Sequence, residues 1–378
     1  MAADIKMKVS ARTDVGRVRT TNEDGLAVND LASGAQIDAQ SGDKAVDVQE
    51  RGVLLALSDG MGGHQAGEIA SALVLESLQA AMQQAARGPI HMQLEEAVKR
   101  ANQTVMEAAH ADNRRGMGAT LTAVFVRGGE AYIAEVGDSR AYLLRNGRLR
   151  QITRDQSLVQ LMVDHGVMSP EEAKRSASKN VILQAMGLAP DVRVAIARLE
   201  LRRNDRFLLC SDGVTNEVSD EELKETLTGS PPRAACETMI SLANERGGRD
   251  NSTVIVADLS GEGLELPDEF ETVTSTYEVL QAFEANLGSG PAITPPPLQP
   301  SAAPMSPAIE ALPDLPDEGG ATANTKASRT APPPVEPASA TQKLPRSKRG
   351  PTWSTVVIVA VVLLALLVLM VVLTGCAA

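Results

Sequence analysis

Four aspartates stand at the ends of apolar, strand-like segments, where a β-sheet can gather several side chains at one edge. Asp59 follows VLLALS, Asp138 follows AYIAEVG, Asp212 follows RFLLCS, and Asp250 lies just before STVIVAD. A single aspartate in such a place most often forms a turn or caps a helix. Four of them in one domain could instead converge, and their charges would then need to be neutralised.

The chemistry that suits such a convergence is the binding of divalent cations. Crowded carboxylates repel one another and take up protons unless cations lie between them. Oxygen ligands without paired histidine or cysteine favour Mg²⁺ or Mn²⁺ over zinc, and the four histidines show no metal-binding spacing. Gly60 and Gly213 follow two of the aspartates and allow tight turns, which would expose a main-chain carbonyl as a further ligand.

Six segments together resemble one known family. They are TDVGRVRTTNED (13–24), LSDGMGGHQAGEIAS (57–71), RGMGATLTA (115–123), EVGDSRAYLLRNG (135–147), CSDGVTNEVSDEEL (210–223) and RDNSTVIVADL (249–259). In order and spacing they match the type 2C metal-dependent protein Ser/Thr phosphatase (PPM) family, and the DGMGGH form is similar to its bacterial branch. The resemblance covers about residues 8–259.

The resemblance implies a fold and a set of metal ligands. The implied fold is α+β, an α-β-β-α four-layer sandwich of two antiparallel sheets flanked by helices, with two metal ions, Mn²⁺ or Mg²⁺, at one end. Asp59 would bridge both ions and Gly60 would lend its carbonyl, while Asp212 and Asp250 would complete the shell of the second ion. Asp138 would join Asp212 at a third, weaker metal site.

The resemblance also implies roles for other residues around the metals. Glu23 and Asp24 would hold metal-bound waters, and Arg19 would grip the substrate phosphate with its planar guanidinium. A bridging water held at Asp59 would be the nucleophile. His64 would protonate the leaving alkoxide, although it could equally be a residue that starts a helix.

The sequence departs from the family pattern in the segment 154–186, which is the family's mobile flap over the cleft. Relatives usually have Asp-His-Ser where this chain has Asp155-Gln156-Ser157, and His-Pro before Arg-Asn where it has Ser176-Ala177 before Lys179-Asn180. These changes bear on substrate choice and on the contribution of the flap. The loop 30–51 has no role that can be assigned.

The elements that must position these residues are predicted from apolar periodicity and turn signals. Gly128-Gly129 and Asn146-Gly147 predict hairpins, so the middle of the sheet is antiparallel. Capping boxes at 169–172 and 219–222 predict helix starts, and helices are also expected over 68–82 and 94–109. Strands are predicted at 52–57, 120–126, 131–136, 141–145, 149–153, 206–210 and 253–259.

Composition divides the chain into four parts: a catalytic domain over 1–260, a Pro/Ala-rich acidic linker over 261–352, a transmembrane helix over 353–374, and a short tail over 375–378. Of 21 prolines, 16 lie between residues 267 and 351. The linker is expected to be disordered, except for a short helix around 276–285.

An apolar run without charges, residues 356–373, predicts a membrane anchor. Basic residues at 343–349 precede it, so the positive-inside rule places the catalytic domain in the cytoplasm, at the plasma membrane.

The formal net charge of −12 and the eight aromatic residues disfavour a nucleic-acid partner. Three cysteines without a CxxC pair disfavour a disulfide framework or a structural zinc site. The leading hypothesis is a membrane-tethered phosphatase that acts on phosphorylated proteins and opposes a cognate Ser/Thr protein kinase. Two alternatives are a catalytically silent module that binds phosphoproteins and a nucleotide-binding enzyme, for which the glycine fingerprint fails at Gln65.

Overall fold

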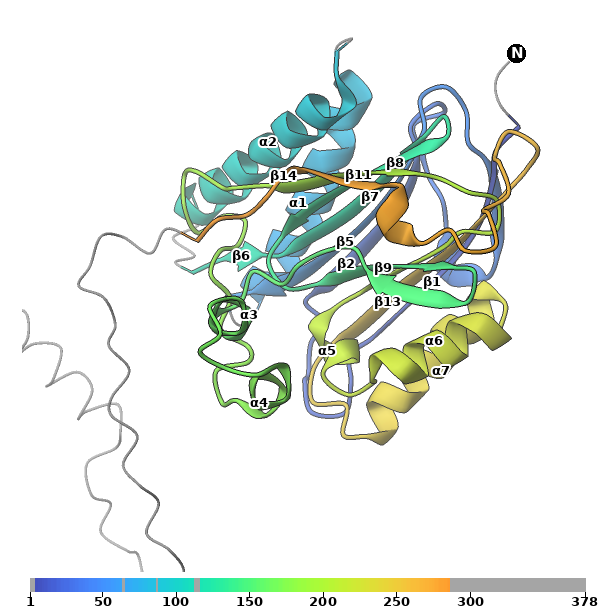
Figure 1. Cartoon of the computed structure of the whole chain (residues 1–378). Coiled ribbons are helices and arrows are strands. Elements are labelled where there is room, and N and C mark those ends of the chain that lie inside the picture. The colour runs from blue at the N-terminus through green and yellow to red at the C-terminus, as the bar shows by residue number, and fades with distance from the viewer. Residues whose placement is uncertain (1–3, 63–64, 86–87, 112–115, 286–378) are drawn as a thin grey trace, which may run out of the picture. The chain divides into compact units, whose positions relative to one another are not determined.

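The computed structural model describes residues 4–62, 65–85, 88–111 and 116–285 (Figure 1). Within these residues the strands form two antiparallel sheets. The smaller has the order β10-β9-β12-β13-β1-β4, and the larger has the order β14-β11-β8-β7-β5-β2-β3, with β6 paired to β5.

The strands span Lys6–Asp14 (β1), Asp24–Asp30 (β2), Ala35–Gln36 (β3), Lys44–Asp47 (β4), Val53–Met61 (β5), Gly118–Ala119 (β6), Leu121–Arg127 (β7), Glu130–Val136 (β8), Arg140–Arg145 (β9), Arg148–Gln151 (β10), Ala195–Glu200 (β11), Arg206–Cys210 (β12), Ser252–Ser260 (β13) and Tyr277–Gln281 (β14).

The core between the sheets is built almost entirely from aliphatic side chains. In β5, Leu55 and Leu57 point into the space between the sheets, whereas Leu54 and Ala56 point to the opposite face and pack under helices. Because successive side chains of a strand alternate between faces, a central strand covered on both sides reads as a continuous apolar run. This explains why the segment 53–57 is easy to recognise in the sequence.

Helices cover the outer faces of both sheets, which confirms the predicted four-layer sandwich. Helices α1 (Gln65–Gln84) and α2 (Ile90–Ala111) pack on the larger sheet, while α5 (Asp212–Thr215), α6 (Asp220–Gly229) and α7 (Pro232–Glu245) pack on the smaller one (Figure 1). Helices α3 (Leu158–Asp164) and α4 (Pro170–Arg175) belong to the flap. The predicted capping boxes start α4 at Ser169 and α6 at Ser219, which confirms both.

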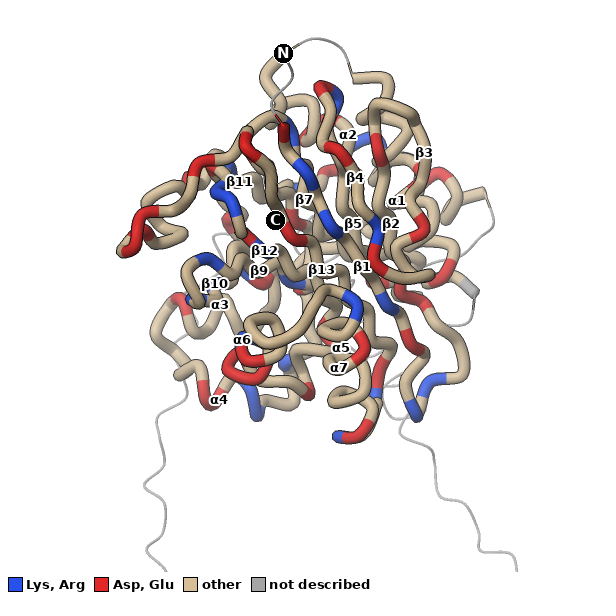
Figure 2. Tube along the Cα trace, turned by 90° about the vertical axis from the view of Figure 1, so that its right-hand side faces the viewer, with Lys and Arg blue, Asp and Glu red and all other residues tan. Residues whose placement is uncertain are grey.

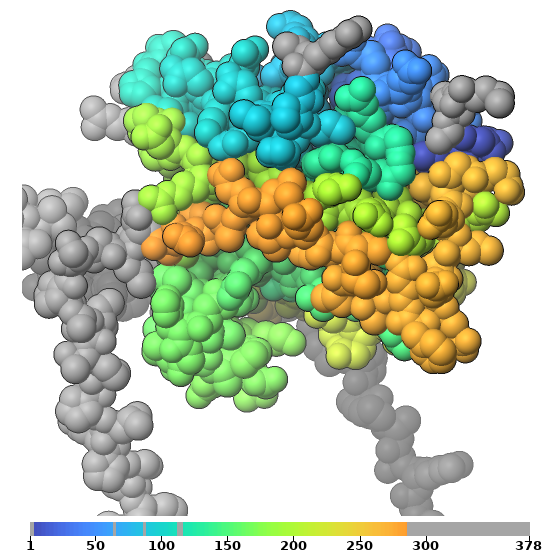
Figure 3. All heavy atoms as spheres, turned by 45° about the horizontal axis from the view of Figure 1, so that its top comes forward, coloured from blue at the N-terminus to red at the C-terminus, as the bar shows by residue number. Residues whose placement is uncertain are grey.

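The predicted domain boundary at residue 260 and the predicted helix at 276–285 are wrong. Residues 277–281 form β14, which pairs with β11 as an edge strand of the larger sheet. We call residues 262–285 the strap, because Figure 3 shows this orange segment lying across one face of the domain. Tyr277 fixes the strap by donating a hydrogen bond to the carbonyl of Ile152 at 2.8 Å.

A buried arginine provides the second anchor of the strap. Arg145 is 2% exposed and donates to both carboxylate oxygens of Asp205, at 2.7 and 2.6 Å. It also reaches Thr276 Oγ1 at 2.6 Å and Glu271 Oε1 at 3.3 Å, and both of these residues belong to the strap. A charged group is retained in a core only when such partners satisfy it, so the strap is part of the folded domain.

The described residues include no helix that is long and apolar enough to cross a membrane. The predicted anchor at 356–373, the linker beyond residue 285 and the tail 375–378 lie outside the described residues. Over the face presented in Figure 2, basic and acidic residues are interspersed.

Candidate active site

Two carboxylates of the site face each other across neighbouring strands of the larger sheet. Asp24 on β2 is paired in register with Asp59 on β5. The main chain at Asp59 is fixed from the other side, because its N–H donates to Thr120 Oγ1 at 2.9 Å. The next residue, Gly60, donates to the carbonyl of Glu23 at 3.1 Å, and a Cβ there would lie 2.1 Å from the carbonyl oxygen of Gly67. Only glycine fits at that point.

Two further carboxylates come from the smaller sheet. Asp212 begins α5 directly after β12, and Asp250 lies just before β13. Because β12 and β13 are antiparallel neighbours, the end of one and the start of the other meet at the same edge. A side chain on Gly213 would clash with the carbonyl of Asn251 at 1.9 Å, so this glycine allows the two ends to lie close together.

The aspartates of both sheets meet with Asp138, which follows β8. Burial first, and then the charges of Asp24, Asp212, Asp138 and Asp250, raise the pKa of Asp59 well above its usual range. Burial likewise raises the pKa of Asp24 to about 7, of Asp138 to about 8 and of Asp212 to about 6, and in each case neighbouring aspartates add to the rise. The structure thus brings the four strand-end aspartates together, as the sequence suggested.

The donor set fits hydrated divalent cations. Within the described residues, Asp24 Oδ1 is buried without a hydrogen-bond partner, while its Oδ2 accepts from Ser211 at 2.8 Å and from Thr253 at 2.7 Å. No group of three or more described His, Cys, Asp or Glu side chains is close enough to enclose an ion alone. Mg²⁺ commonly keeps several water ligands, so a site that offers only a few carboxylate oxygens suits it better than a closed cage would.

Arg19 lies at the exposed rim of the site. Its Nη2 donates to Asp250 Oδ2 at 2.8 Å, and its side chain is 47% exposed. Partial burial opposes the charge of this guanidinium, but Asp250, with Glu23 and Asp59 further away, raises its pKa overall. Arg19 therefore stays charged and has donors left to bind an incoming anion.

The loop that carries Arg19 is fastened by Asn251, a residue that the sequence analysis missed. Asn251 is buried, and its amide donates to the carbonyls of Val15 at 3.0 Å and Thr21 at 2.9 Å. Its Oδ1 accepts from the N–H of Glu23 at 2.8 Å, which places Glu23 beside the aspartates. The only available signal was its position directly after Asp250. The remaining predicted site residue, His64, lies outside the described residues.

Gln156 ties the flap to the turn that carries Asp138. Its main-chain N–H donates to the carbonyl of Gly137 at 2.8 Å, and its Oε1 accepts from the N–H of Gly137 at 2.8 Å. Its Nε2 donates to the carbonyl of Glu135 at 3.1 Å. From within the flap, Leu183 N–H and Gln184 Nε2 donate to it at 2.7 Å each. The sequence showed Gln156 as a departure from the family pattern but gave no role for it.

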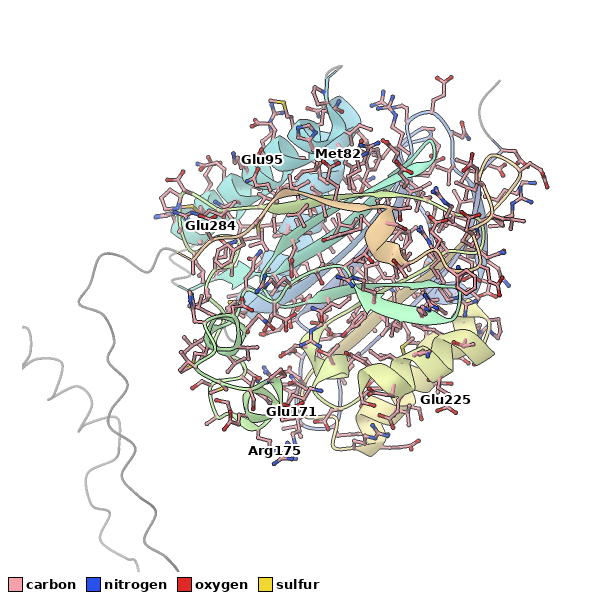
Figure 4. All side chains as sticks on the ribbon, in the orientation of Figure 1. Met82, Glu95, Glu171, Arg175, Glu225 and Glu284 are labelled. Carbon is pink, nitrogen blue, oxygen red and sulfur yellow. The ribbon has the colours of Figure 1, made fainter. Side chains whose placement is uncertain are left out.

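A cleft of about 460 Å³ opens from the aspartates between the flap and the start of α6. Asp138 and Asp212 lie in its wall, together with Lys174 and Lys179 of the flap. Lys179 donates to Asn216 Oδ1 at 2.8 Å, which links the flap to the end of α5. Glu171 and Arg175 of α4 are exposed, and Figure 4 shows them at the far end of the flap from α2. The flap therefore forms one wall of the route to the carboxylates.

A two-sheet sandwich in which buried aspartates from both sheets gather beside a cleft fits the class of metal-dependent phosphatases, and comparison with known proteins identifies the family. The model of the family described as Protein phosphatase 2C matches residues 36–251. This chain belongs to that family.

Several relatives share most of the described domain. The chain is 38% identical over 254 residues to the serine/threonine protein phosphatase PstP of Mycobacterium tuberculosis, which covers 67% of this chain and 45% of PstP. It therefore spans less than half the length of PstP. It is 33% identical over 265 residues to the serine/threonine phosphatase stp of Listeria monocytogenes, which covers 68% of this chain and 98% of that protein.

Solved structures agree with the fold. The catalytic domain of PstP in complex with two manganese ions matches with a TM-score of 0.57 and 37% identity, over 68% of this chain and 99% of that one. The Streptococcus agalactiae serine/threonine phosphatase matches with a TM-score of 0.59 and 31% identity, over 68% of this chain and 100% of that one.

Proposed function

We propose that this protein is a metal-dependent phosphatase that hydrolyses phosphoserine and phosphothreonine on proteins. The observation that carries the proposal is the convergence of Asp24, Asp59, Asp138, Asp212 and Asp250 from both sheets, with one oxygen of Asp24 buried and without a partner among the described residues. The names of the relatives and the manganese ions in the PstP structure support the same activity.

Two divalent ions, Mn²⁺ or Mg²⁺, would be held by Asp59, the carbonyl of Gly60, Asp212 and Asp250, with a third at Asp138 and Asp212. When bound, such ions polarise a water and neutralise phosphoryl charge. Glu23 and Asp24 would orient bound waters, since one carboxylate oxygen of Asp24 has no partner in the described part of the chain while Ser211 and Thr253 fix the other.

Arg19 would bind the phosphate of the substrate. Its guanidinium needs only to exchange its bond with Asp250 for two phosphate oxygens, because nearly half of the side chain already faces solvent. His64 would supply the proton for the leaving serine or threonine oxygen. The slow uncatalysed hydrolysis of phosphate monoesters makes such combined charge neutralisation necessary.

We further propose that the enzyme acts at the plasma membrane against a cognate Ser/Thr kinase, with the apolar run 356–373 as its anchor and the catalytic domain in the cytoplasm. This placement rests on the sequence alone. A fusion of a reporter to the C-terminus should be detected only outside the cytoplasm.

The reaction is tested with a phosphothreonine peptide and the full chain, with Mn²⁺ or with EDTA. We expect turnover that requires Mn²⁺ and falls by at least about 100-fold in Asp212→Asn, because one removed metal ligand weakens charge neutralisation in the transition state. Asp47→Asn, an exposed aspartate on β4, is the matched control and should keep full activity. The absence of Mn²⁺-dependent turnover would favour the alternative of a silent phosphoprotein-binding module, and equal turnover by wild type and Asp212→Asn would show that Asp212 does not hold a catalytic metal.

A further inference from the structure

A second cavity, distinct from the cleft above, lies between the larger sheet, the root of the flap and the strap. Its volume is about 430 Å³, which is within the range of small-molecule sites. The sheet contributes Ile133 and Ala197, the flap contributes Leu161 and Leu183, and the strap closes one side with the alternate residues Tyr277, Val279 and Gln281. The walls are therefore mainly apolar.

One polar group in this wall lacks a partner. Glu135 on β8 is 3% exposed; its Oε2 accepts from the N–H of Arg154 at 2.9 Å, but its Oε1 has no hydrogen-bond partner within the described residues. Leaving a buried carboxyl oxygen unpaired is costly, and a donor from a ligand would remove that cost. Glu135 is not among the residues assigned above to the metals or the phosphate.

The other charged residues around the cavity indicate which charge a ligand should carry. Arg140 donates to the carboxylate of Asp155, twice from Nε and once from Nη2, and Asp164 pairs with Arg154. These pairs are internally balanced. Glu135 remains without a basic side-chain partner in the described structure, and Glu284 contributes a further carboxylate at the end of the strap, where Figure 4 labels it. Burial raises the pKa of Glu135, but an ammonium group bound beside it would displace the proton, so an apolar cavity with these two carboxyl groups suits a cation.

We propose that this cavity binds a small organic cation, with its apolar body between the sheet and the strap and its ammonium group donating to Glu135. The proposal does not depend on the phosphatase reaction.

A short chain of hydrogen bonds connects this cavity to the active site. The carbonyl of Glu135 accepts a hydrogen bond from Gln156. Gln156 also bonds to both the N–H and the carbonyl of Gly137, the residue before Asp138. A ligand that orders Glu135 therefore acts on both the flap and the Asp138 turn.

The test is calorimetric binding of tryptamine to the full chain without added metal. We expect saturable 1:1 binding, with 3-ethylindole, which lacks the ammonium, and indole-3-propionate, which reverses the charge, each binding at least about tenfold more weakly. Glu135→Gln keeps the shape of the side chain and an acceptor for Arg154, and it should weaken tryptamine at least about tenfold. Glu130→Gln, on the same strand but outside the cavity, is the matched control and should bind as the wild type does.

A second variant tests the cavity independently, in case Glu135→Gln loses binding only because it folds poorly. Val279 is 56% exposed, so Val279→Trp should fold and should block the cavity from the strap side. We expect it to abolish binding. The proposal is overturned if tryptamine shows no saturable binding, if 3-ethylindole binds as well as tryptamine does, or if both Glu135→Gln and Val279→Trp bind tryptamine like the wild type.

Discussion

At the scale of single residues, the buried carboxyl of Glu135 has a consequence for stability. Burial raises its pKa well above the ordinary value of 4.5; the Arg154 N–H opposes this, and Asp155 and Asp138 add to it. The unfolded chain therefore releases this proton at a lower pH than the folded chain does. The contribution of the protonated Glu135 carboxyl to the stability of the folded state is complete below about pH 4.5. It is lost as the pH rises through the pKa that Glu135 has in the folded state.

We expect Glu135→Gln to be more stable than the wild type at pH 8, because burial raises the pKa of the Glu135 carboxyl and its ionisation at high pH costs the folded state stability, whereas glutamine carries no charge. Well below pH 4.5 the difference should shrink, because the wild-type carboxyl is then protonated in both states. Urea unfolding at the two pH values, followed by circular dichroism, measures this. An equal difference at both pH values would mean that Glu135 does not titrate differently in the folded and unfolded states.

At the scale of elements, the flap is held by Gln156 more than by its own short helices. Helices α3 and α4 have seven and six residues and could not persist alone. The bonds of Gln156 to Gly137, Leu183 and Gln184 replace the packing that longer helices would provide. The position of the flap is thereby linked to the turn that carries Asp138.

We expect Gln156→Ala to raise KM for a phosphopeptide at least about threefold and to increase the Mn²⁺ concentration needed for half-maximal activity, because several bonds to the Asp138 turn are lost. Gln160→Ala, one helical turn further on, is the control. In an Asp138→Asn background the effect of Gln156→Ala on Mn²⁺ dependence should disappear. Additive effects of the two substitutions would show that Gln156 acts only through general stability.

The elements also show how far the sequence can predict this fold. Strands β5, β7, β8 and β12 were predicted because continuous apolar runs between turn residues mark buried central strands. The first strand was missed, although Met7, Val9 and Ala11 alternate with polar residues and lie buried. Such a short alternation is easily overlooked between charged residues.

The strap was misread for a different reason. Tyr277, Leu280 and Phe283 recur every three residues, which is close to a helical repeat, and only the pairing with β11, about 80 residues earlier, makes the segment a strand. In the site, the aspartates were predictable because each stands beside an apolar strand. Asn251 and Gln156 were not, because their roles are hydrogen bonds to partners that lie far away in sequence or on another element.

At the scale of the whole molecule, the catalytic unit extends to the end of the strap rather than to residue 260. A chain cut at 260 keeps every predicted metal ligand and Arg19 but loses Glu271 and Thr276, two partners of the buried Arg145. It also loses Val273 and Tyr277 from the edge of the core.

We expect the chain 1–260 to be less stable than the chain 1–285 by on the order of 3–5 kcal/mol, because hydrogen bonds to a buried charge and apolar burial are lost together. Urea unfolding of the two chains measures this difference. Glu271→Gln in the longer chain isolates one contact and should account for only part of the loss. If both chains unfold at the same urea concentration, the strap pairs with the domain but contributes nothing measurable to its stability.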